Sequence, residues 1–286
     1  MKVAHLIITY TDPLQTERMV KRMLDPDFDF YIHVDAKMPL NSHELLAKLP
    51  NVYFIKNRID VKWAGFSTIQ AELNSIHEIL DSKRSYDFVS LLSGQDYPIR
   101  TVNEMKQFYE ERKGKLMLKY REFEHEWVEG MERVSRYYLA NYSFLGRYFV
   151  ERLMNQLLPK RKLPKGLKFY GSSMFWCLST DVLKYVLENV EQNNQRKRFY
   201  KFTWAPDEFL FQTEILNSPF ADKVINENCH YYKHPPHTPN PQWLGVNDIN
   251  DIMQSDRIFA RKFNTNRDPE ILNQLDILID QRVQNS

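Results

Sequence analysis

The sequence predicts an α/β protein with a mostly parallel central sheet flanked by helices. Apolar runs of strand length, such as residues 3–10 and 28–34, alternate with patterns of helical spacing, such as residues 68–80. This alternation is typical of parallel sheets with helices on their faces. The chain has 286 residues, of which 43% are hydrophobic and 27% charged. We therefore expect a single domain over residues 1–286 with a sizeable core.

Each element expected in the first part of the chain has a local signal. Residues 3–10 are a nearly continuous apolar run, as in a strand covered on both faces. Asp12 and Pro13 then provide the cap and the first position of a helix. We predict further strands over residues 28–34, 51–55 and 88–92, and a helix over residues 68–80 with Ile69, Leu73, Ile76 and Leu80 on one face.

The second part of the chain gives weaker patterns. Residues 120–165 mix aromatic and charged side chains, which indicates a helical or irregular insertion over the sheet. A strand over 171–178 and a helix over 181–190 follow. Pro206 is expected to open a helix that runs to about residue 216, prolines over 235–241 mark a loop, and Asp268 with Pro269 starts a final amphipathic helix.

Composition excludes some classes of function. The net charge is +2, from 39 basic and 37 acidic residues, which gives no whole-protein case for a nucleic-acid partner. Cys177 and Cys229 form no CxxC pair, so zinc and a disulfide framework are poorly supported. Neither a leader nor an apolar stretch of about 20 residues is evident, so we expect a cytoplasmic protein.

Two short basic runs leave open where in the cell the protein lies. Residues 160–162 read Lys-Arg-Lys, and residues 196–198 read Arg-Lys-Arg. The simpler interpretation is a solvated surface. The alternative is a contact with a phosphate or with anionic lipid, in which case the protein would rest peripherally on the inner face of a membrane.

Candidate binding residues lie where ligands of parallel sheets gather, at the carboxyl ends of the strands. Tyr10, Asp35 and the turn Ser93-Gly94-Gln95-Asp96 occupy such places. Trp63 and Trp243 are candidate stacking surfaces for a base or a sugar, with core packing as the alternative for each.

Glu208 is the strongest candidate for a catalytic base. It ends Pro206-Asp207-Glu208 and precedes Phe209, and a carboxylate in an apolar setting can be tuned as a general base. Inverting sugar transfer needs one such base to deprotonate the acceptor hydroxyl. For Asp207, helix capping is an equal alternative.

The adjacent cations Arg261 and Lys262 would suit a diphosphate leaving group, because apolar residues flank them. Surface salt bridging is the alternative. The turn over residues 93–96 carries one carboxylate, Asp96, which makes a poor metal site. Acidic triplets over residues 25–29 precede a strand and fit turn chemistry better. We therefore expect no metal and no other cofactor, and cations would neutralise the diphosphate instead.

Three histidines, His230, His234 and His237, lie close together beside Lys233. Their spacing does not match a zinc-binding helix. We expect loop histidines that contact solvent or substrate.

Six segments, taken in order, resemble the family of core-2/I-branching N-acetylglucosaminyltransferases and peptide O-xylosyltransferases. They are HVD at 33–35, WAGFS at 63–67, LLSGQDYPIRT at 91–101, GSSMFW at 171–176, PDE at 206–208 and FARKF at 259–263. The resemblance covers residues 3–263. It implies a GT-A-type, Rossmann-like fold with a nucleotide-binding half over 1–115 and an acceptor-binding and catalytic half over 116–286.

The resemblance also implies roles for single residues. Asp35 would read the uracil of a UDP-sugar with Trp63 beside the nucleotide, and Glu208 would be the base. Arg261 and Lys262 would hold the diphosphate, and Asp96 would lie near the donor sugar. We add Tyr10 to the donor site, and Asp207 and Trp243 to the acceptor site.

The sequence departs from the family pattern in two respects. The animal relatives are membrane-anchored and cysteine-rich, whereas this chain looks like a compact bacterial-type catalytic domain. An upstream arginine found in one branch of the family is missing between Lys233 and Asp256, and Lys233 or a histidine is the expected replacement.

The function that these observations favour is metal-independent, inverting transfer of N-acetylglucosamine or xylose from a UDP-sugar to a hydroxyl of a glycan or peptide. One alternative is a glycoside hydrolase that uses Glu208 and Asp96 as paired carboxylates. Another is a non-catalytic module of the same fold that binds a glycan or a nucleotide.

Overall fold

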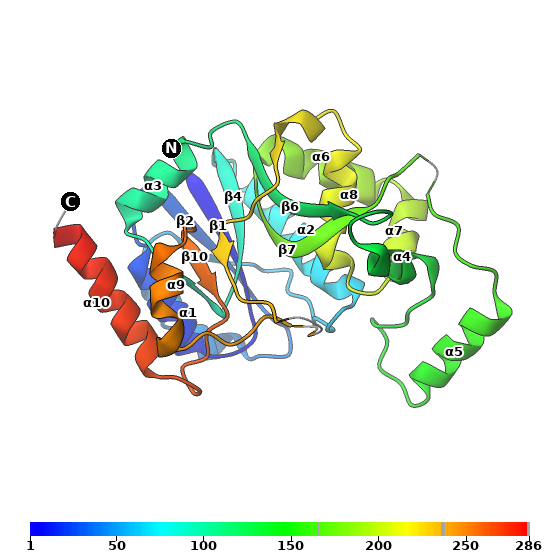
Figure 1. The fold of residues 1–286 in the computed structure, drawn as a ribbon, viewed down its shortest axis with the longest axis horizontal. Coiled ribbons are helices and arrows are strands. Elements are labelled where there is room, and N and C mark those ends of the chain that lie inside the picture. Colours follow the sequence, from blue (N-terminus) through cyan, green and yellow to red (C-terminus); the bar gives the residue numbers. More distant parts are fainter. Residues whose placement is uncertain (165, 236–237, 239, 285–286) are drawn as a thin grey trace.

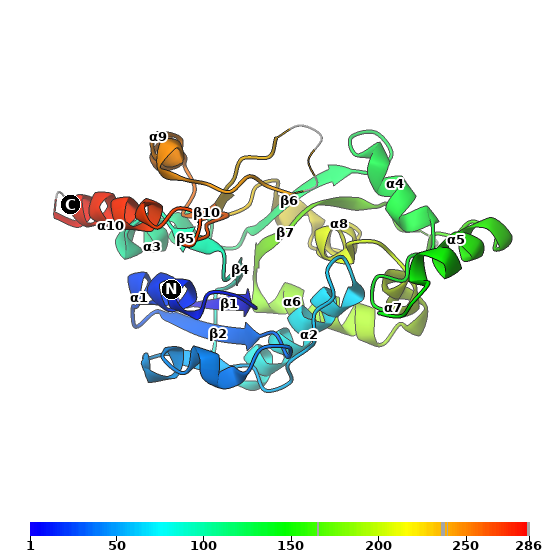
Figure 2. The same cartoon turned by 90° about the horizontal axis from the view of Figure 1, so that it is seen from below.

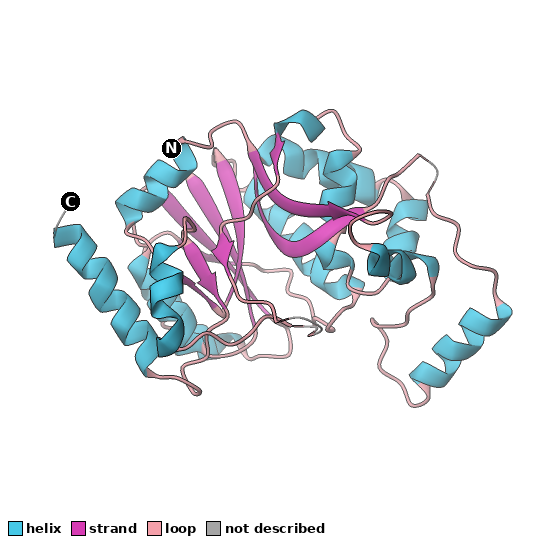
Figure 3. Cartoon of the chain, viewed as in Figure 1, coloured by secondary structure: helices cyan, strands magenta, loops and turns pink. Residues whose placement is uncertain are grey.

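The computed structural model describes residues 1–164, 166–235, 238 and 240–284. Its main sheet has seven strands in the order β3-β2-β1-β4-β7-β6-β8. The strands are β1 Val3–Thr9, β2 Phe28–Val34, β3 Val52–Phe54, β4 Phe88–Ser93, β6 Leu116–Glu122, β7 Tyr170–Leu178 and β8 Val224–Ile225. The first four are mutually parallel, β7 runs antiparallel to both its neighbours, and β8 is parallel to β6. The predicted α/β fold with a mostly parallel sheet is confirmed (Figures 1 and 3).

A second sheet holds the strands β5 Asp96–Pro98, β9 His230–Tyr231 and β10 Phe259–Arg261, with β10 in the middle. This sheet carries the end of the 93–96 turn and the arginine of the Arg261-Lys262 pair. Because Arg261 is registered opposite Asp96, two residues that are 165 positions apart become direct neighbours.

Helices cover both faces of the main sheet. The helices of the described residues are α1 Pro13–Arg22, α2 Phe66–Asp81, α3 Val102–Glu110, α4 Val128–Ser135, α5 Arg147–Leu157, α6 Thr180–Glu191, α7 Asn194–Lys201, α8 Leu210–Leu216, α9 Ile249–Gln254 and α10 Glu270–Gln284. Side chains of α2, α6 and α8 pack into the core on one face, and those of α1, α3 and α10 pack into the core on the other. Figure 2 shows the two groups apart.

Strand β1 explains why the sequence signal was a continuous apolar run. Ala4 and Leu6 enter one core, while Val3 and Ile7 enter the other, since successive side chains of a strand point to opposite faces. The predicted helix start after β1 is confirmed as well, because the Gln15 amide donates to Asp12 Oδ1 at 3.0 Å.

Two expectations for the second half of the chain are wrong. The segment from Pro206 is not one helix: a 3₁₀ turn over Pro206–Glu208 is followed by Phe209, with φ −151° and ψ −10°, before α8 begins. The buried ring of Phe209 packs between Phe123 and Tyr200, and this packing outweighs helix propensity. The insertion over 120–165 does not cover the sheet either, since its start is strand β6 and α5 lies at the far end of the molecule (Figure 1).

Candidate active site

The carboxyl edge of β1 and β2 presents two of the predicted donor-site residues. Thr9 is registered opposite Val34, so Tyr10 and Asp35 leave the sheet side by side. The Tyr10 side chain is exposed, whereas Asp35 is buried and accepts hydrogen bonds from the amides of Lys37 (2.9 Å) and Val61 (3.3 Å). The Asp35 carboxylate is therefore held in a fixed orientation.

Trp63 lies on the loop between β3 and α2, and its side chain is 69% exposed. Its ring meets that of Trp204 edge-on at 5.1 Å between centroids. Next to this contact, the Ala205 amide donates to the Ala64 carbonyl at 2.8 Å. An exposed face of Trp63 thus stays open to a ligand, and the loop that carries it is tied to the turn that carries Glu208.

Gln15 of α1 joins two loops at the same edge of the sheet, a role that the sequence did not indicate. Its Nε2 donates to the carbonyls of Gly94 (2.9 Å) and Phe263 (3.4 Å), and its Oε1 accepts from the Thr265 amide (3.3 Å). A Cβ atom at Gly94 would lie 2.4 Å from Thr9 Oγ1, so only glycine fits there. These contacts bring residues 261–265 beside the ends of β1 and β4.

Asp96 is completely buried and fully engaged. Its carboxylate accepts from the Ser93 amide (2.7 Å), the Ser93 hydroxyl (2.9 Å) and Arg261 Nε (3.1 Å), and His230 Nε2 lies 3.3 Å away. Burial raises the pKa of Asp96, but His230 and Arg261 outweigh this effect and hold the pKa below its ordinary value. The Asp96 carboxylate therefore orients Arg261.

The expectation for the histidines is wrong at His230. This residue lies in β9 rather than in a loop, is buried, and packs with its ring tilted against that of Phe175 at 4.4 Å between ring centroids. Burial lowers its pKa. His234 is exposed, and His237 lies outside the described residues. Among the described residues, the only group of three or more histidine, cysteine or acidic side chains close enough to share a metal ion is Glu122, Glu124 and His125.

Lys262 differs from Arg261 in its partners. The Arg261 guanidinium pairs with Asp96 and lies 4.2 Å from the Phe175 ring centroid. Lys262 Nζ lies 4.2 Å from the Trp243 ring centroid, and no carboxylate of the described residues pairs with it. Burial lowers the pKa of Lys262, and the charges of Arg261 and Arg267 add to this effect. Lys262 is thus a cation without a counter-ion in the described part of the chain.

Arg267 is a further cation at this place that the sequence analysis missed. Its guanidinium lies 5.2 Å from the Trp243 ring centroid, so the indole contacts two cations. This places Trp243 beside the predicted diphosphate residues, and its acceptor role stays a prediction. Lys233, the expected substitute for a missing arginine, is paired with Asp248 (2.6 Å) and Asp251 (2.7 Å).

Glu208 lies on the 3₁₀ turn with its side chain 34% exposed. Its Oε2 accepts from Arg133 of α4 at 2.5 Å, and the Arg133 guanidinium lies 4.7 Å from the Trp127 ring centroid. A Cβ atom at Gly171 would lie 2.7 Å from the Glu208 carbonyl oxygen, so glycine lets β7 approach the turn. Arg133 fixes one carboxylate oxygen of Glu208; the other oxygen has no partner among the described residues.

Asp207 and Glu72 are a pair of interacting carboxyl groups; Glu72 is buried, and Asp207 is half-buried with its Oδ1 shielded from solvent. Burial, and then the charge of Glu208, raise the pKa of Asp207 to about 7. Burial, and then Asp207, raise the pKa of Glu72 well above its ordinary value. Glu72 Oε2 accepts from the Trp176 indole at 3.3 Å, while its Oε1 has no partner among the described residues. Glu72 was not predicted, because its position on the buried face of α2 carries no sequence signal.

The sequence of the whole chain was also compared with models of known protein families. The model of the core-2/I-branching enzyme family matches residues 3–254. The chain belongs to this family. The resemblance seen in the six sequence segments is thereby confirmed.

Curated relatives of the chain carry names of glycosyltransferases. It is 26% identical to xylosyltransferase oxt of Drosophila pseudoobscura pseudoobscura, over 92% of this chain and 31% of the relative. It is 27% identical to xylosyltransferase 1 of Rattus norvegicus, over 92% of this chain and 33% of the relative. The chain thus spans about a third of the length of these relatives.

Solved structures that resemble the chain include mouse xyloside xylosyltransferase 1 in its apo form. That structure is 11% identical in sequence, covers 90% of this chain and 97% of its own, and has a TM-score of 0.42. The galactosyltransferase LgtC, in complex with donor and acceptor sugar analogs, is also 11% identical. It covers 91% of this chain and 86% of its own, with a TM-score of 0.42.

In this family member, each basic run contains an arginine with a structural role. Arg161 is buried and donates to the carbonyls of Arg136 (3.1 Å) and Phe202 (2.9 Å), and burial lowers its pKa to about 10. Arg196 pairs with Glu214 at 2.5 Å.

Among the described residues, no helix is long and apolar enough to cross a bilayer.

The raised pKa of Asp207 leads to a prediction for the variant Asp207→Asn. Folding raises this pKa from 3.8 to about 7, so the native state resists ionisation of Asp207. The wild type therefore loses stability as the pH rises from about 4 through about 7, and the variant is spared this loss. Chemical denaturation should show the variant gaining about 2 kcal/mol over wild type between pH 5 and pH 8. A stability difference that does not change with pH would contradict this.

Proposed function

We propose that this chain is an inverting glycosyltransferase that transfers a sugar from UDP to a hydroxyl of a glycan or peptide without a metal ion. The observation that carries the proposal is the position of Glu208. It is a partly exposed carboxylate with one oxygen fixed by Arg133 and the other unpartnered among the described residues. The names of the curated relatives favour xylose as the sugar, with N-acetylglucosamine as the second candidate.

The donor would bind along the carboxyl edge of β1, β2 and β4. Asp35, oriented by two backbone amides, would accept from the uracil, and the exposed ring of Trp63 would pack beside the nucleoside. Tyr10 lies at the same edge. Lys262 and Arg267 would meet the diphosphate, because no described carboxylate competes for the ammonium of Lys262.

The chemistry follows from one base and fixed cations. Glu208 takes the proton of the acceptor hydroxyl as that oxygen attacks the anomeric carbon from the face opposite UDP. The bond between the anomeric carbon and the phosphate oxygen breaks, and the electron pair leaves with UDP. Lys262 and Arg267 stabilise the negative charge that grows on the terminal phosphate. Attack from the opposite face inverts the anomeric centre.

The state of Asp96 supports the metal-free form of this proposal. A divalent cation at the end of β4 would need free carboxylate oxygens, whereas the oxygens of Asp96 face Ser93, Arg261 and His230. The same contacts disfavour a glycoside hydrolase. Asp96 is buried with a lowered pKa, and an acid catalyst needs an exposed carboxyl group that keeps its proton.

A donor screen tests the proposed activity. Purified protein is incubated with single UDP-sugars and mixed glycan and peptide acceptors, and released UDP is measured. We expect release from UDP-xylose or UDP-N-acetylglucosamine that acceptors accelerate. Binding of UDP without release from any UDP-sugar would favour the non-catalytic module instead.

Activity is expected to survive removal of divalent metals. The physical reason is that Lys262 and Arg267 supply the positive charge at the diphosphate, and Asp96 is occupied by protein donors. UDP release is measured in excess EDTA and again after manganese is added, and the two rates should agree within about twofold. Complete loss in EDTA that manganese reverses would show that a metal does this work.

A further inference from the structure

Helix α5 exposes its apolar side. Phe149, Leu153 and Leu157 follow each other at intervals of four, so they share one face. Their exposed fractions are 70%, 41% and 73%, and no residue of α5 is buried. In Figures 1 and 2, α5 lies at one end of the molecule, away from the sheet and from the C-terminal helix α10.

The polar side of α5 attaches the helix to the protein. Glu151 accepts from the Leu139 amide at 2.9 Å, and Asn155 exchanges hydrogen bonds with the amide and the carbonyl of Tyr137, both at 2.8 Å. Positions two apart on a helix differ by about 200° around its axis, so Glu151 lies opposite Phe149 and Leu153. A helix that covers a core has the reverse polarity.

The loop before α5 extends the apolar area. Leu145 is fully exposed and the ring of Phe144 is exposed in this loop, as is the ring of Tyr148 in the first turn of α5. We call residues 144–157 the α5 surface. Several large apolar side chains exposed close together in one segment are typical of an interaction site.

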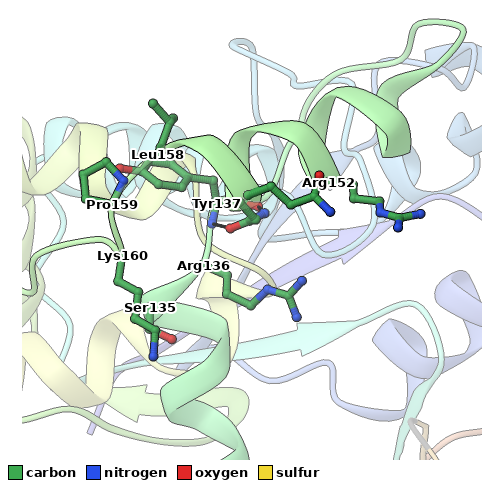
Figure 4. A pocket seen from close by; sticks show the side chains of 9 residues that line it. Ser135, Arg136, Tyr137, Arg152, Leu158, Pro159 and Lys160 are labelled. Carbon is green, nitrogen blue, oxygen red and sulfur yellow. Dashed lines mark hydrogen bonds between the residues drawn. The ribbon is translucent and has the colours of Figure 1, made fainter.

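Positive charge surrounds the α5 surface. Residues 142–162 contain five basic residues, of which only Arg161 is buried, and one acidic residue, and the acid, Glu151, is engaged with a backbone amide. Arg136, Arg152 and Lys160 line a hollow of about 420 Å³ between α5 and residues 135–137 (Figure 4). Arg136 pairs with Glu132, whereas no described carboxylate pairs with Arg152 or Lys160.

We propose that the α5 surface docks on an anionic phospholipid bilayer. Phe149, Leu153 and Leu157 enter the boundary between headgroups and acyl chains, and Arg152 and Lys160 contact lipid phosphates. Apolar residues on one side of a helix with flanking basic residues are typical of helices that lie in a membrane interface. A second copy of the chain fits less well, because its α5 surface would bring the same positive charges into contact.

The proposal is tested by flotation of the full chain with vesicles of phosphatidylcholine alone or with phosphatidylglycerol. We expect binding to the anionic vesicles that falls as salt rises. The triple variant Phe149→Ser, Leu153→Ser, Leu157→Ser should bind on the order of 100-fold more weakly. The double variant Arg152→Ala, Lys160→Ala should lose roughly 25-fold.

Ile277→Ser is the matched control, because Ile277 is 57% exposed on α10 at the opposite end of the molecule. It should bind like wild type. The thermal midpoint of the triple variant should equal that of wild type, since the three side chains contribute little to the core. Equal vesicle binding by wild type and triple variant would overturn the proposal, as would absence of wild-type binding or a wild-type dimer that the triple variant abolishes.

Discussion

The variant Glu208→Gln is expected to lower the rate of sugar transfer by about two to four orders of magnitude. Glutamine keeps the size of the side chain and can still contact Arg133, but it cannot take a proton from the acceptor hydroxyl. Affinity for UDP should change by less than about twofold, because we place the nucleotide at the ends of β1, β2 and β4. Single-turnover kinetics with the preferred donor, together with titration calorimetry for UDP, measure the two quantities separately.

Glu132→Gln is the matched control for this variant. Glu132 lies next to Arg133 on α4 and pairs with Arg136 at 2.5 Å in an exposed position, so it tests the loss of a carboxylate beside the arginine that holds Glu208. We expect transfer at the wild-type rate. Near-normal turnover by Glu208→Gln would remove Glu208 from the role of base, whatever the control shows.

The second large effect is expected for Lys262→Ala. A hydrogen bond between ionised groups contributes about 1.5–3 kcal/mol, so affinity for UDP should fall about 10- to 100-fold, and transfer should slow with it. Of the two adjacent cations, Lys262 gives the clearer test, because Arg261 is held by Asp96 and its removal would also take the arginine partner from a buried carboxylate. Titration calorimetry with UDP measures the change.

Lys197→Ala is the control for a cation in a basic run on α7, and its affinity for UDP should equal that of wild type. Equal affinities of wild type and Lys262→Ala would show that Lys262 does not contact the diphosphate. Arg267→Ala would then be the next variant to titrate, since the same indole of Trp243 lies beside both cations.

Five strands of the main sheet, β1, β2, β3, β4 and β7, could be predicted from the sequence because each is a local pattern, whereas the other strands were not predicted. β2 begins and ends where the run Phe28–Val34 does, and β1 and β4 agree within one residue with their apolar runs. Local sequence patterns do not predict secondary structure correctly where contacts with distant residues determine the backbone conformation. Phe209 interrupts the predicted helix because its ring belongs to an aromatic cluster that includes Phe123 and Phe169, which are far away in the chain.

In the candidate site, too, the sequence indicated single residues but not the contacts between residues far apart in the chain. The sequence singled out Glu208, Asp35 and Lys262 from their neighbours along the chain. It could not indicate that Arg133 holds Glu208, because 75 positions separate the pair and one arginine among many basic residues carries no local signal. The engagement of Asp96 by His230 and Arg261 likewise depends on the pairing of β5 with β10.

The sequence also could not show that the apolar side of α5 faces outward. Its sequence has the spacing of an amphipathic helix, and such spacing does not show which side meets the protein. Only the hydrogen bonds of Glu151 and Asn155 to residues 137–139 reveal that the apolar side faces outward.

The stereochemistry of the product tests the central claim most directly. UDP-xylose and UDP-N-acetylglucosamine carry the sugar in the α configuration, and a single base that activates the acceptor opposite the leaving UDP must give a β-linked product. Proton NMR of the product of one enzymatic transfer distinguishes the two anomers by the coupling of the anomeric proton. The account predicts the large coupling of a β linkage; an α-linked product would contradict it.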